Sequence, residues 1–387
     1  MLSFIMEQTK KPWTHARVLV PILLLLCLVA VAGYGLYAQT TKPSAVAQPI
    51  LPPETTTPVA EATSTPPEPA PQPTRVPLPE EVRGLYWTAE TARSSRADAL
   101  IEYITKTKLN TVVIDLKMDN GQIALPSAEL MDTLAAKAIY RIARIPVMRD
   151  STYALEHFED AIKNTSGAAW RDKTGAIWLD PSKEAVVTFN LALARQAYDL
   201  GFDEIQFDYV RFASDGSLSA IAKTEAERTQ SKQEIMRVFF EKVGGTLKRE
   251  GIPVSFDVFG VAFLSDNEVG VGQHLIDLYP HADFISPMTY PSHYWPGHLG
   301  YQNPALYPYA VVKDTLDKGA KLLEDAGIAS STVSRPQFRP WLQDFDIGAV
   351  YTAARIEAQI KAARDAGASG WMLWNARNVY EPANYVE

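Results

Sequence analysis

The chain has 387 residues, 47% of them hydrophobic, and a formal net charge of −8 at pH 7. This length and apolar content suffice for one large domain with additional segments. The acidic balance, with no basic cluster in the body of the chain, argues against nucleic acid as the main partner. Cys27 is the only cysteine, which excludes an intrachain disulfide and a thiolate metal site.

Residues 18–37 form a continuous apolar run near the N-terminus. Twenty residues at about 1.5 Å each match a hydrocarbon core of about 30 Å, which predicts a transmembrane signal-anchor helix. Three basic residues precede the run and only Lys42 closely follows it. The positive-inside rule therefore places the tail, residues 1–17, in the cytoplasm and exports the rest of the chain. The alternative is a cleaved signal peptide, with its cleavage site at residues 30–32, and a secreted product.

Residues 38–80 follow as a linker rich in proline and threonine. This segment holds 12 of the 27 prolines of the chain, mixed with alanine and glutamate. Such a composition predicts a disordered, semi-rigid spacer, whose extended reach is on the order of 130 Å at about 3.1 Å per residue. We expect it to hold a folded domain away from the lipid bilayer. A docking site for a proline-reading module is the alternative.

Residues 81–387 alternate between apolar, strand-like runs and segments of good helix formers. Glycines such as Gly201 and Gly251 end several of these predicted helices. Eight alternations over about 300 residues predict an α/β fold, a (β/α)8 TIM barrel. A doubly wound open sheet is the alternative, but the first predicted strand lacks the glycine-rich turn typical of that fold. The predicted strands are 83–88, 111–117, 142–149, 205–211, 254–259, 284–290, 337–342 and 370–375, and a loop or hairpin insertion is predicted at 150–180.

Several predicted strands carry polar residues on the face that points into the barrel. Successive side chains of a strand alternate between the barrel interior and the surrounding helices. This period of two directs Gln206 and Asp208 inward on one strand, Asp257 on the next, and Asp115 on an earlier one. Barrel interiors are normally filled by branched apolar residues, and barrel enzymes place their chemistry at the C-terminal ends of the strands. The pattern therefore predicts an active site at this rim, and a buried network of ion pairs is the alternative.

Asp208 and Asp257 form the candidate catalytic pair. Cleavage of a glycosidic bond needs one ionised carboxylate as nucleophile or base and one protonated carboxyl as acid. We assign Asp208 to the first role and Asp257 to the second. The predicted substrate-binding residues combine polar groups with aromatic rings, which suit the two kinds of surface on a sugar. They are Asp115, Lys117, Arg144, Asp150, Gln206, Arg211, Tyr290, Trp295, Trp341 and Trp374.

Other chemistries fit the sequence less well. No zinc-protease helix motif and no serine-hydrolase elbow is present. His293 and His298 share a predicted loop and leave a two-histidine metal site as an alternative. Acidic residues at the rim leave a hard cation as another. The prediction is a site without metal or cofactor.

The predicted barrel resembles a bacterial family of glycoside-hydrolase-like domains, first catalogued as a domain of unknown function and placed in the glycosidase barrel superfamily. The resemblance spans roughly residues 82–380. It implies a TIM barrel and a glycosidase-related activity. It rests on eight segments in order: RGLYWTA, NTVVIDLKMDNGQI, RIPVMRD, GFDEIQFDYVRF, SFDVFG, ISPMTYPSHYWPG, RPWLQDF and GWMLWNA.

Two better-known barrel families refine the assignment. The fourth strand of chitinase-like barrels reads D-x-x-D-x-D-x-E and ends on the catalytic acid. Those positions are here Asp203, Gln206, Asp208 and Val210, so the chitinase acid is missing. Amylase-like barrels place a nucleophilic aspartate on strand 4 and an acid on strand 5, and the positions of Asp208 and Asp257 are similar to this arrangement.

The sequence as a whole predicts a membrane-tethered glycoside hydrolase outside the cytoplasm. Its predicted partners are an envelope or extracellular polysaccharide and the bilayer, with no nucleic acid. Two alternatives remain: a non-catalytic carbohydrate-binding barrel that displays the same groove, and a structural envelope protein with a silent barrel mouth.

Overall fold

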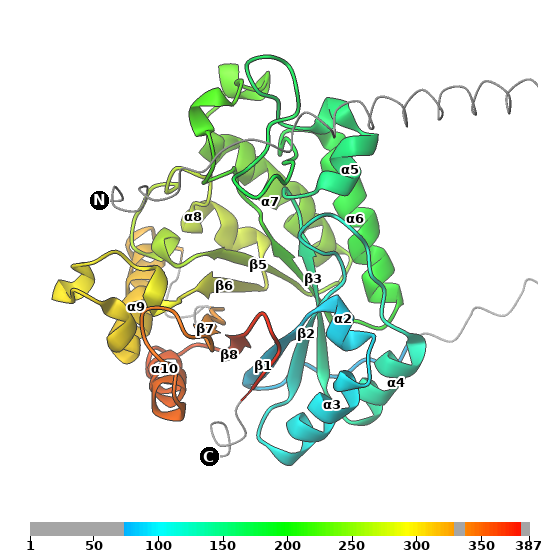
Figure 1. The fold of residues 1–387 in the computed structure, drawn as a ribbon, viewed down its shortest axis with the longest axis vertical. Coiled ribbons are helices and arrows are strands. Elements are labelled where there is room, and N and C mark those ends of the chain that lie inside the picture. The colour runs from blue at the N-terminus through cyan, green and yellow to red at the C-terminus, as the bar shows by residue number, and fades with distance from the viewer. Residues whose placement is uncertain (1–72, 329–336, 381–387) are drawn as a thin grey trace, which may run out of the picture. The chain divides into compact units, whose positions relative to one another are not determined.

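The structure is a computed structural model that describes residues 73–328 and 337–380. Eight parallel strands close a barrel in which each strand pairs with its sequence neighbour and the last pairs with the first, so the predicted (β/α)8 barrel is confirmed (Figure 1). The strands are β1 (Val82–Trp87), β2 (Thr111–Asp115), β3 (Tyr140–Pro146), β4 (Glu204–Asp208), β5 (Val254–Phe259), β6 (Phe284–Met288), β7 (Trp341–Gln343) and β8 (Gly370–Trp374).

Helices surround the strands and cover the outer face of the barrel (Figure 1). They are α2 (Ala89–Ala92), α3 (Arg96–Lys106), α4 (Ala128–Ala136), α5 (Ser151–Glu156), α6 (Glu184–Asp199), α7 (Lys232–Arg249), α8 (Leu275–Leu278), α9 (Pro308–Asp325) and α10 (Ala353–Asp365). Among the described residues, none of the helices combines the length and apolarity needed to cross a bilayer. The predicted anchor at residues 18–37 lies outside the described residues.

Side-chain caps and glycines set the ends of the helices. Ser231 begins α7 with a capping box that it shares with Glu234, and Ser127 accepts a 3.2 Å hydrogen bond from the amide of Leu130 at the start of α4. Gly201 and Gly251, which follow α6 and α7, have φ of +105° and +74°. This left-handed conformation suits glycine after a helix, and it ends each helix just before the next strand, as predicted.

The insertion predicted at residues 150–180 contains α5, a single 3₁₀ turn and several antiparallel bridges. Bridges join Arg149 to Trp178, Lys163 to Ala169 and Arg171 to Ile177. The segment is therefore an irregular hairpin with a short helix. It lies after β3 and stands on the same side as the other loops that follow the C-terminal ends of strands.

The apolar core has two layers, as alternation along the strands requires. A large cluster fills the space between strands and helices and includes Ile114, Phe207 and Phe256. A smaller cluster fills the barrel interior and includes Val113 and Met372. Hydrophobic burial in both layers fixes which face of each strand points inward, and with it the direction of every polar side chain at the rim.

An ionic network closes the barrel at the end where the strands begin. Glu204 is fully buried, forms an ion pair with Arg339 and accepts a 2.6 Å hydrogen bond from Ser255. Residues 73–80, the end of the predicted linker, lie against this end without regular structure. The amide of Val76 donates to Asp203 at 2.8 Å, so the packed part of the chain begins before residue 81.

Candidate active site

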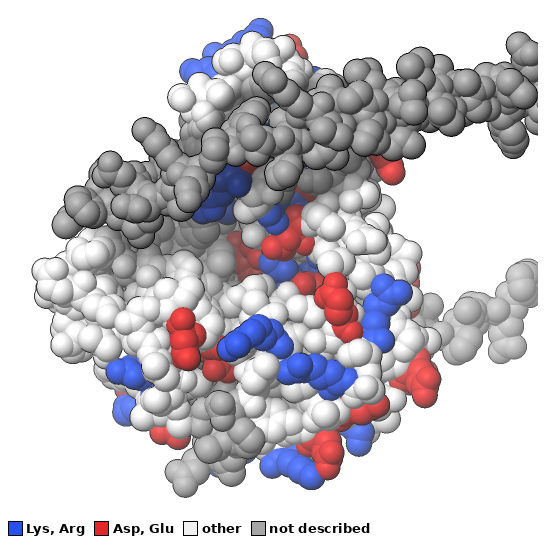
Figure 2. All heavy atoms as spheres, in the orientation of Figure 1, with Lys and Arg blue, Asp and Glu red and all other residues white. Residues whose placement is uncertain are grey.

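Four strands bring charged side chains to the C-terminal rim of the barrel. Asp115 ends β2, Arg144 lies on β3, Asp208 ends β4 and Asp257 lies on β5. The register pairs Asp115 with Arg144 and Phe207 with Phe256, so Asp208 and Asp257 lie at one level on neighbouring strands. Neighbouring strands are about 4.8 Å apart. Figure 2 shows acidic and basic side chains gathered in a hollow near the middle of the visible face.

Arg144 is the centre of the charged cluster. Its Nη1 donates to Asp115 Oδ1 at 2.7 Å, while its Nε and Nη2 donate to Asp208 Oδ2 at 3.0 and 2.5 Å. A third carboxylate, Asp119 in the loop after β2, lies 3.3 Å from Nη2. Because hydrogen bonds from a guanidinium stabilise the charged form of a carboxyl, this arrangement favours an ionised Asp208.

The residue after Asp208 has a strained backbone that supports the carboxylate. Tyr209 has φ of +51°, a conformation that is uncommon for a bulky residue. Its amide donates to Asp208 Oδ1 at 2.6 Å. Strain of this kind costs about 1–3 kcal/mol and persists where the surroundings enforce it, typically at functional sites.

Asp257 lies in a different environment from Asp208. It is 1% exposed, and its Oδ1 accepts a 2.8 Å hydrogen bond from the indole Nε1 of Trp341 on β7. Among the described residues, no cation lies within ion-pair distance of this carboxyl. Burial, reinforced by the charge of Asp208, raises the pKa of Asp257 well above its ordinary value. Burial therefore favours the neutral, protonated form of Asp257.

The environment of Asp115 is intermediate between those of Asp208 and Asp257. Burial raises its pKa to about 6, although Arg144 and a 2.5 Å hydrogen bond from the Tyr86 hydroxyl both oppose this rise. Tyr86 in turn stacks on Trp374 with ring centroids 4.0 Å apart. Trp374 also lies 5.1 Å beneath the Arg144 guanidinium. The ring pair and the ion cluster therefore form one continuous wall of the barrel mouth.

Two other predicted site residues lie close to this centre. Tyr290, after β6, is buried, and burial together with the charges of Asp257 and Asp208 raises its pKa well above the ordinary value. Gln206 lies one layer below Asp208 and donates to Ser286 Oγ at 3.2 Å. Gln206 is fully buried and forms part of the floor beneath the rim carboxylates.

Lys117 and Asp150 pair with each other and not with the central cluster. Their side chains have no exposed area, and Lys117 Nζ lies 2.8 Å from Asp150 Oδ2. Asp150 also caps α5 by accepting from the amide of Tyr153 at 2.8 Å. Asp150 lies beyond the end of β3 and is directed toward Lys117. In this structure the pair anchors the start of α5.

Trp295 and the two candidate metal-binding histidines lie on the loops after β6. Trp295 is 53% exposed and packs edge-on against His298 with centroids 4.7 Å apart. His293 instead packs against Tyr290, at 5.3 Å. The two histidines thus have separate neighbours. The grouping of metal-capable side chains found in the described ranges is His157, Glu159 and Asp160, which is mostly exposed on the insertion.

Sequence reasoning missed several members of the polar interior. Glu204 was omitted although it shares the inward face of Gln206 and Asp208, so the period of two contained the signal. Arg339, its partner, precedes a strand that was predicted too early. Asp119 lies in a loop, and only the three-dimensional structure brings it within reach of Arg144 and, at 3.3 Å, of the Tyr209 hydroxyl.

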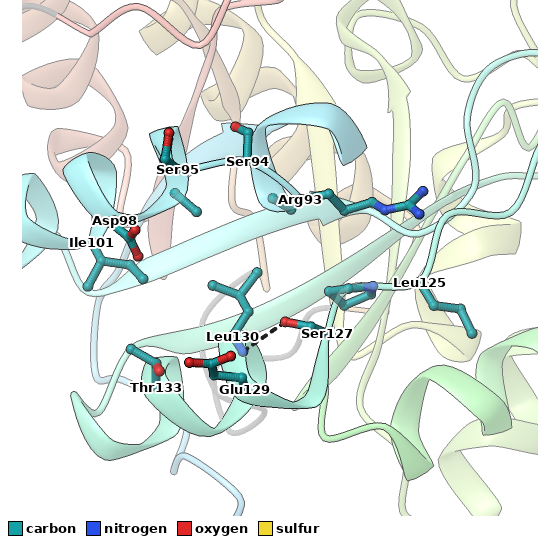
Figure 3. A pocket seen from close by; sticks show the side chains of 13 residues that line it. Arg93, Ser94, Ser95, Asp98, Ile101, Leu125, Ser127, Glu129, Leu130 and Thr133 are labelled. Atoms are coloured by element: carbon teal, nitrogen blue, oxygen red, sulfur yellow. Dashed lines mark hydrogen bonds between the residues drawn. The ribbon is translucent and has the colours of Figure 1, made fainter.

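A separate groove of about 510 Å³ lies outside the barrel mouth, between α3 and the start of α4 (Figure 3). Arg93, Ser95, Asp98 and Glu129 are among the side chains that line it. Ser127, also in its wall, uses its hydroxyl oxygen to cap α4 (Figure 3). This groove lacks the buried pair of carboxyls found at the rim, so the rim remains the candidate active site.

Comparisons with known proteins concern the family and the fold of the barrel. A family model described as "Putative glycosyl hydrolase domain" matches residues 126–380. No curated protein matches the chain. The fold is similar to that of the PgaB (BpsB) glycoside hydrolase domain from Bordetella bronchiseptica, with 14% identity, 77% of this chain and 95% of that chain covered, and a TM-score of 0.54.

Two further solved structures are similar. The α-galactosidase TtGalA from Thermus thermophilus is 13% identical, with 81% of this chain and 60% of that chain covered and a TM-score of 0.50. A hypothetical protein from Ruminiclostridium thermocellum is 27% identical, with 45% of this chain and 97% of that chain covered and a TM-score of 0.40.

Proposed function

Because the chain belongs to this family of glycosyl hydrolase domains, we propose that it cleaves a polysaccharide with Asp208 and Asp257 as its catalytic carboxyls. The observation that carries the proposal is the contrast between these two aspartates. Asp208 receives two hydrogen bonds from Arg144, whereas the carboxyl of Asp257 is bonded, within the described part of the chain, only to a neutral indole, and burial favours its neutral form. Glycosidases need such a pair, one carboxyl ionised and the other protonated.

In the proposed reaction, Asp257 donates its proton to the glycosidic oxygen as the bond between that oxygen and the anomeric carbon breaks. Asp208 stabilises the positive charge that develops on the sugar, as nucleophile or as an ionic partner. Water then adds a hydroxyl group to the anomeric carbon, which breaks any bond that Asp208 has formed to that carbon, and the remaining proton of the water returns to Asp257. The raised pKa of Asp257 favours this return.

Arg144 holds Asp208 and Asp115 in place through three short hydrogen bonds and limits their repulsion. Tyr86 and Trp374, stacked beside Arg144, offer ring surface to a sugar. The exposed Trp295 is suited to hold a more distant sugar unit of the polymer.

The catalytic assignment is tested with Asp208→Asn and Asp257→Asn. Each variant of the full chain is incubated with a panel of envelope and extracellular polysaccharides, and the release of reducing ends is measured. We expect each substitution to lower kcat by a factor of at least about 10³, while Arg237→Met, an exposed surface change, leaves it unaltered. Unchanged cleavage by either aspartate variant would overturn the assignment.

One observation favours the alternative of a binding barrel without catalysis. Asp208 and Asp257 are only 8% and 1% exposed, so little of either carboxyl is accessible to a substrate in this structure. Calorimetric titration of the same glycans decides between the two functions. A glycan that binds to the barrel mouth and is never cut by the wild-type chain identifies a binding module.

We further propose that residues 18–37 anchor the chain in a membrane and that residues 38–80 hold the barrel outside the cytoplasm. Support comes from the apolar run and from the excess of basic residues before it. Protease treatment of intact cells tests the proposal. A barrel that is cleaved off and recovered outside fits the topology, while a barrel protected until lysis contradicts it.

A further inference from the structure

Arg211 stands three residues beyond Asp208 and is enclosed by aromatic rings. Its guanidinium carbon lies 4.5 Å from the ring centre of Phe259, 4.8 Å from that of Trp178 and 5.3 Å from that of Tyr209. The residue is 8% exposed. Attraction between a cation and a ring face contributes about 0.5–2 kcal/mol per contact, so the rings fix the position of the guanidinium.

This cation has no carboxylate partner among the described residues. Its Nη1 donates to the carbonyl oxygen of Phe212 at 3.0 Å and to Ser214 Oγ at 3.1 Å. No hydrogen bond of Nε or Nη2 occurs within those residues, and neither atom is completely enclosed. Arg144 and Arg149, by contrast, each bond directly to carboxylates.

The free edge of Arg211 is the one that binds carboxylates best. Nε and Nη2 together form a planar fork that donates two parallel hydrogen bonds to the two oxygens of one carboxylate. Burial lowers the pKa of Arg211, yet a guanidinium remains charged at neutral pH. The charges of Asp208 and Asp215 offset only part of the cost of burying this cation, and an anionic ligand bonded to the fork would offset more of it.

Arg211 lies next to the candidate catalytic centre. Tyr209 connects the two: its amide donates to Asp208, and its ring stacks on the Arg211 guanidinium. Tyr209 and Phe259 are only half-buried, so each keeps ring surface available beside the fork. A sugar unit adjacent to the cleavage point therefore meets a ring face and a carboxylate-binding fork together.

We propose that Arg211 binds the carboxylate of an acidic sugar of the uronic acid type, in a subsite beside Asp208. The inference rests on the proposed function, since it names the class of polysaccharide that this site accepts. Phe259 and Tyr209 pack against the sugar ring, and Nε and Nη2 of Arg211 bond to its carboxylate. The site thus prefers acidic to neutral glycans although the whole chain is acidic.

The test separates binding from cleavage. Asp257→Asn, which mimics the neutral form of Asp257 and retains the charge of the rim, is titrated calorimetrically with polygalacturonate and alginate oligosaccharides. The same oligosaccharides, with each carboxylate reduced to a primary alcohol, serve as the neutral probes. We expect an acidic probe to bind at least about 10-fold more tightly than its reduced counterpart. Equal affinities for both would overturn the inference even if neutral glycans are cleaved.

Arg211→Met and Arg211→Lys, each combined with Asp257→Asn, test whether Arg211 causes the preference for acidic glycans. Both are expected to reduce the ratio of acidic to neutral affinity about 10-fold or more, because lysine keeps the charge but lacks the fork. Arg237→Met, on the exposed face of α7, should keep the ratio. Circular dichroism verifies folding, and the comparison of the two probes on the Asp257→Asn chain decides the inference even if both Arg211 variants unfold. Binding of dextran sulfate as tight as that of polygalacturonate would overturn the assignment to a carboxylate.

Discussion

Replacement of Arg144 by methionine removes the guanidinium that bonds to both Asp115 and Asp208. The side chain of Arg144 is almost fully buried, and its contacts to these carboxylates measure 2.5 to 3.0 Å. Loss of one partner from a buried ion pair costs about 3–5 kcal/mol, because the other charge stays buried. We expect Arg144→Met to lower the free energy of unfolding by this amount at pH 7.

The loss should depend on pH in a defined direction. Without the guanidinium, a carboxyl escapes its buried charge by taking up a proton. For an ordinary carboxyl with a pKa near 3.9, this costs about 4 kcal/mol at pH 7 and about 1.5 kcal/mol at pH 5. The difference between variant and wild type therefore shrinks as the pH falls toward 5.

Denaturant unfolding of both proteins at pH 5 and pH 8 measures this effect. Arg195→Met is the matched control, because Arg195 forms a 2.6 Å ion pair with Glu250 on the surface, where such pairs contribute at most about 1 kcal/mol. If Arg144→Met destabilises the barrel equally at the two pH values, packing and not charge explains the role of Arg144.

Three further predictions concern single residues. Because the folded-state pKa of Asp257 is raised, wild-type stability declines as the pH rises above about 4 toward that pKa. Thermal midpoints from pH 4 to 9 should therefore decline less in Asp257→Asn, and parallel curves would contradict this. Trp341→Phe removes the hydrogen bond that lowers the pKa of Asp257, so the alkaline limb of the pH–rate profile should move to higher pH. A shift of this limb to lower pH would refute the acid role. Glu204→Gln leaves Arg339 buried without its partner and should cost about 3–5 kcal/mol in urea unfolding. The kcat of its folded fraction should stay within about threefold, and a larger loss would place Glu204 in the mechanism.

The strands and the inward direction of the rim residues could be predicted from the sequence, because the alternation of side chains is a local property of a strand. Gln206 and Asp208 face inward, as a period of two predicts, and so do Asp115 and Asp257. Glu204 obeys the same rule, so its inward direction is also predictable from the sequence.

The sequence does not predict in the same way which side chains pair with one another. Asp150 is adjacent in sequence to β3 but pairs with Lys117, because the chain turns beyond both strand ends. Trp341 reaches Asp257 across 84 positions, and Asp119 reaches Arg144 from a loop. Such contacts depend on closure of the barrel and on side-chain rotamers, which no local pattern encodes.

The roles of the two aspartates follow from the charges and contacts around each of them. Asp115, Asp119 and Asp208 all face one guanidinium, so a fourth ionised carboxyl at Asp257 would add uncompensated charge to a dry site. Burial therefore favours the neutral form at Asp257, which forms no ion pair among the described residues, while Asp208 keeps the closest contacts to Arg144. We thus expect these two aspartates to take opposite roles, because Arg144 bonds to Asp208 and not to Asp257. This is why Arg144, which never has to touch the glycosidic bond, is expected to be as important for cleavage as either aspartate.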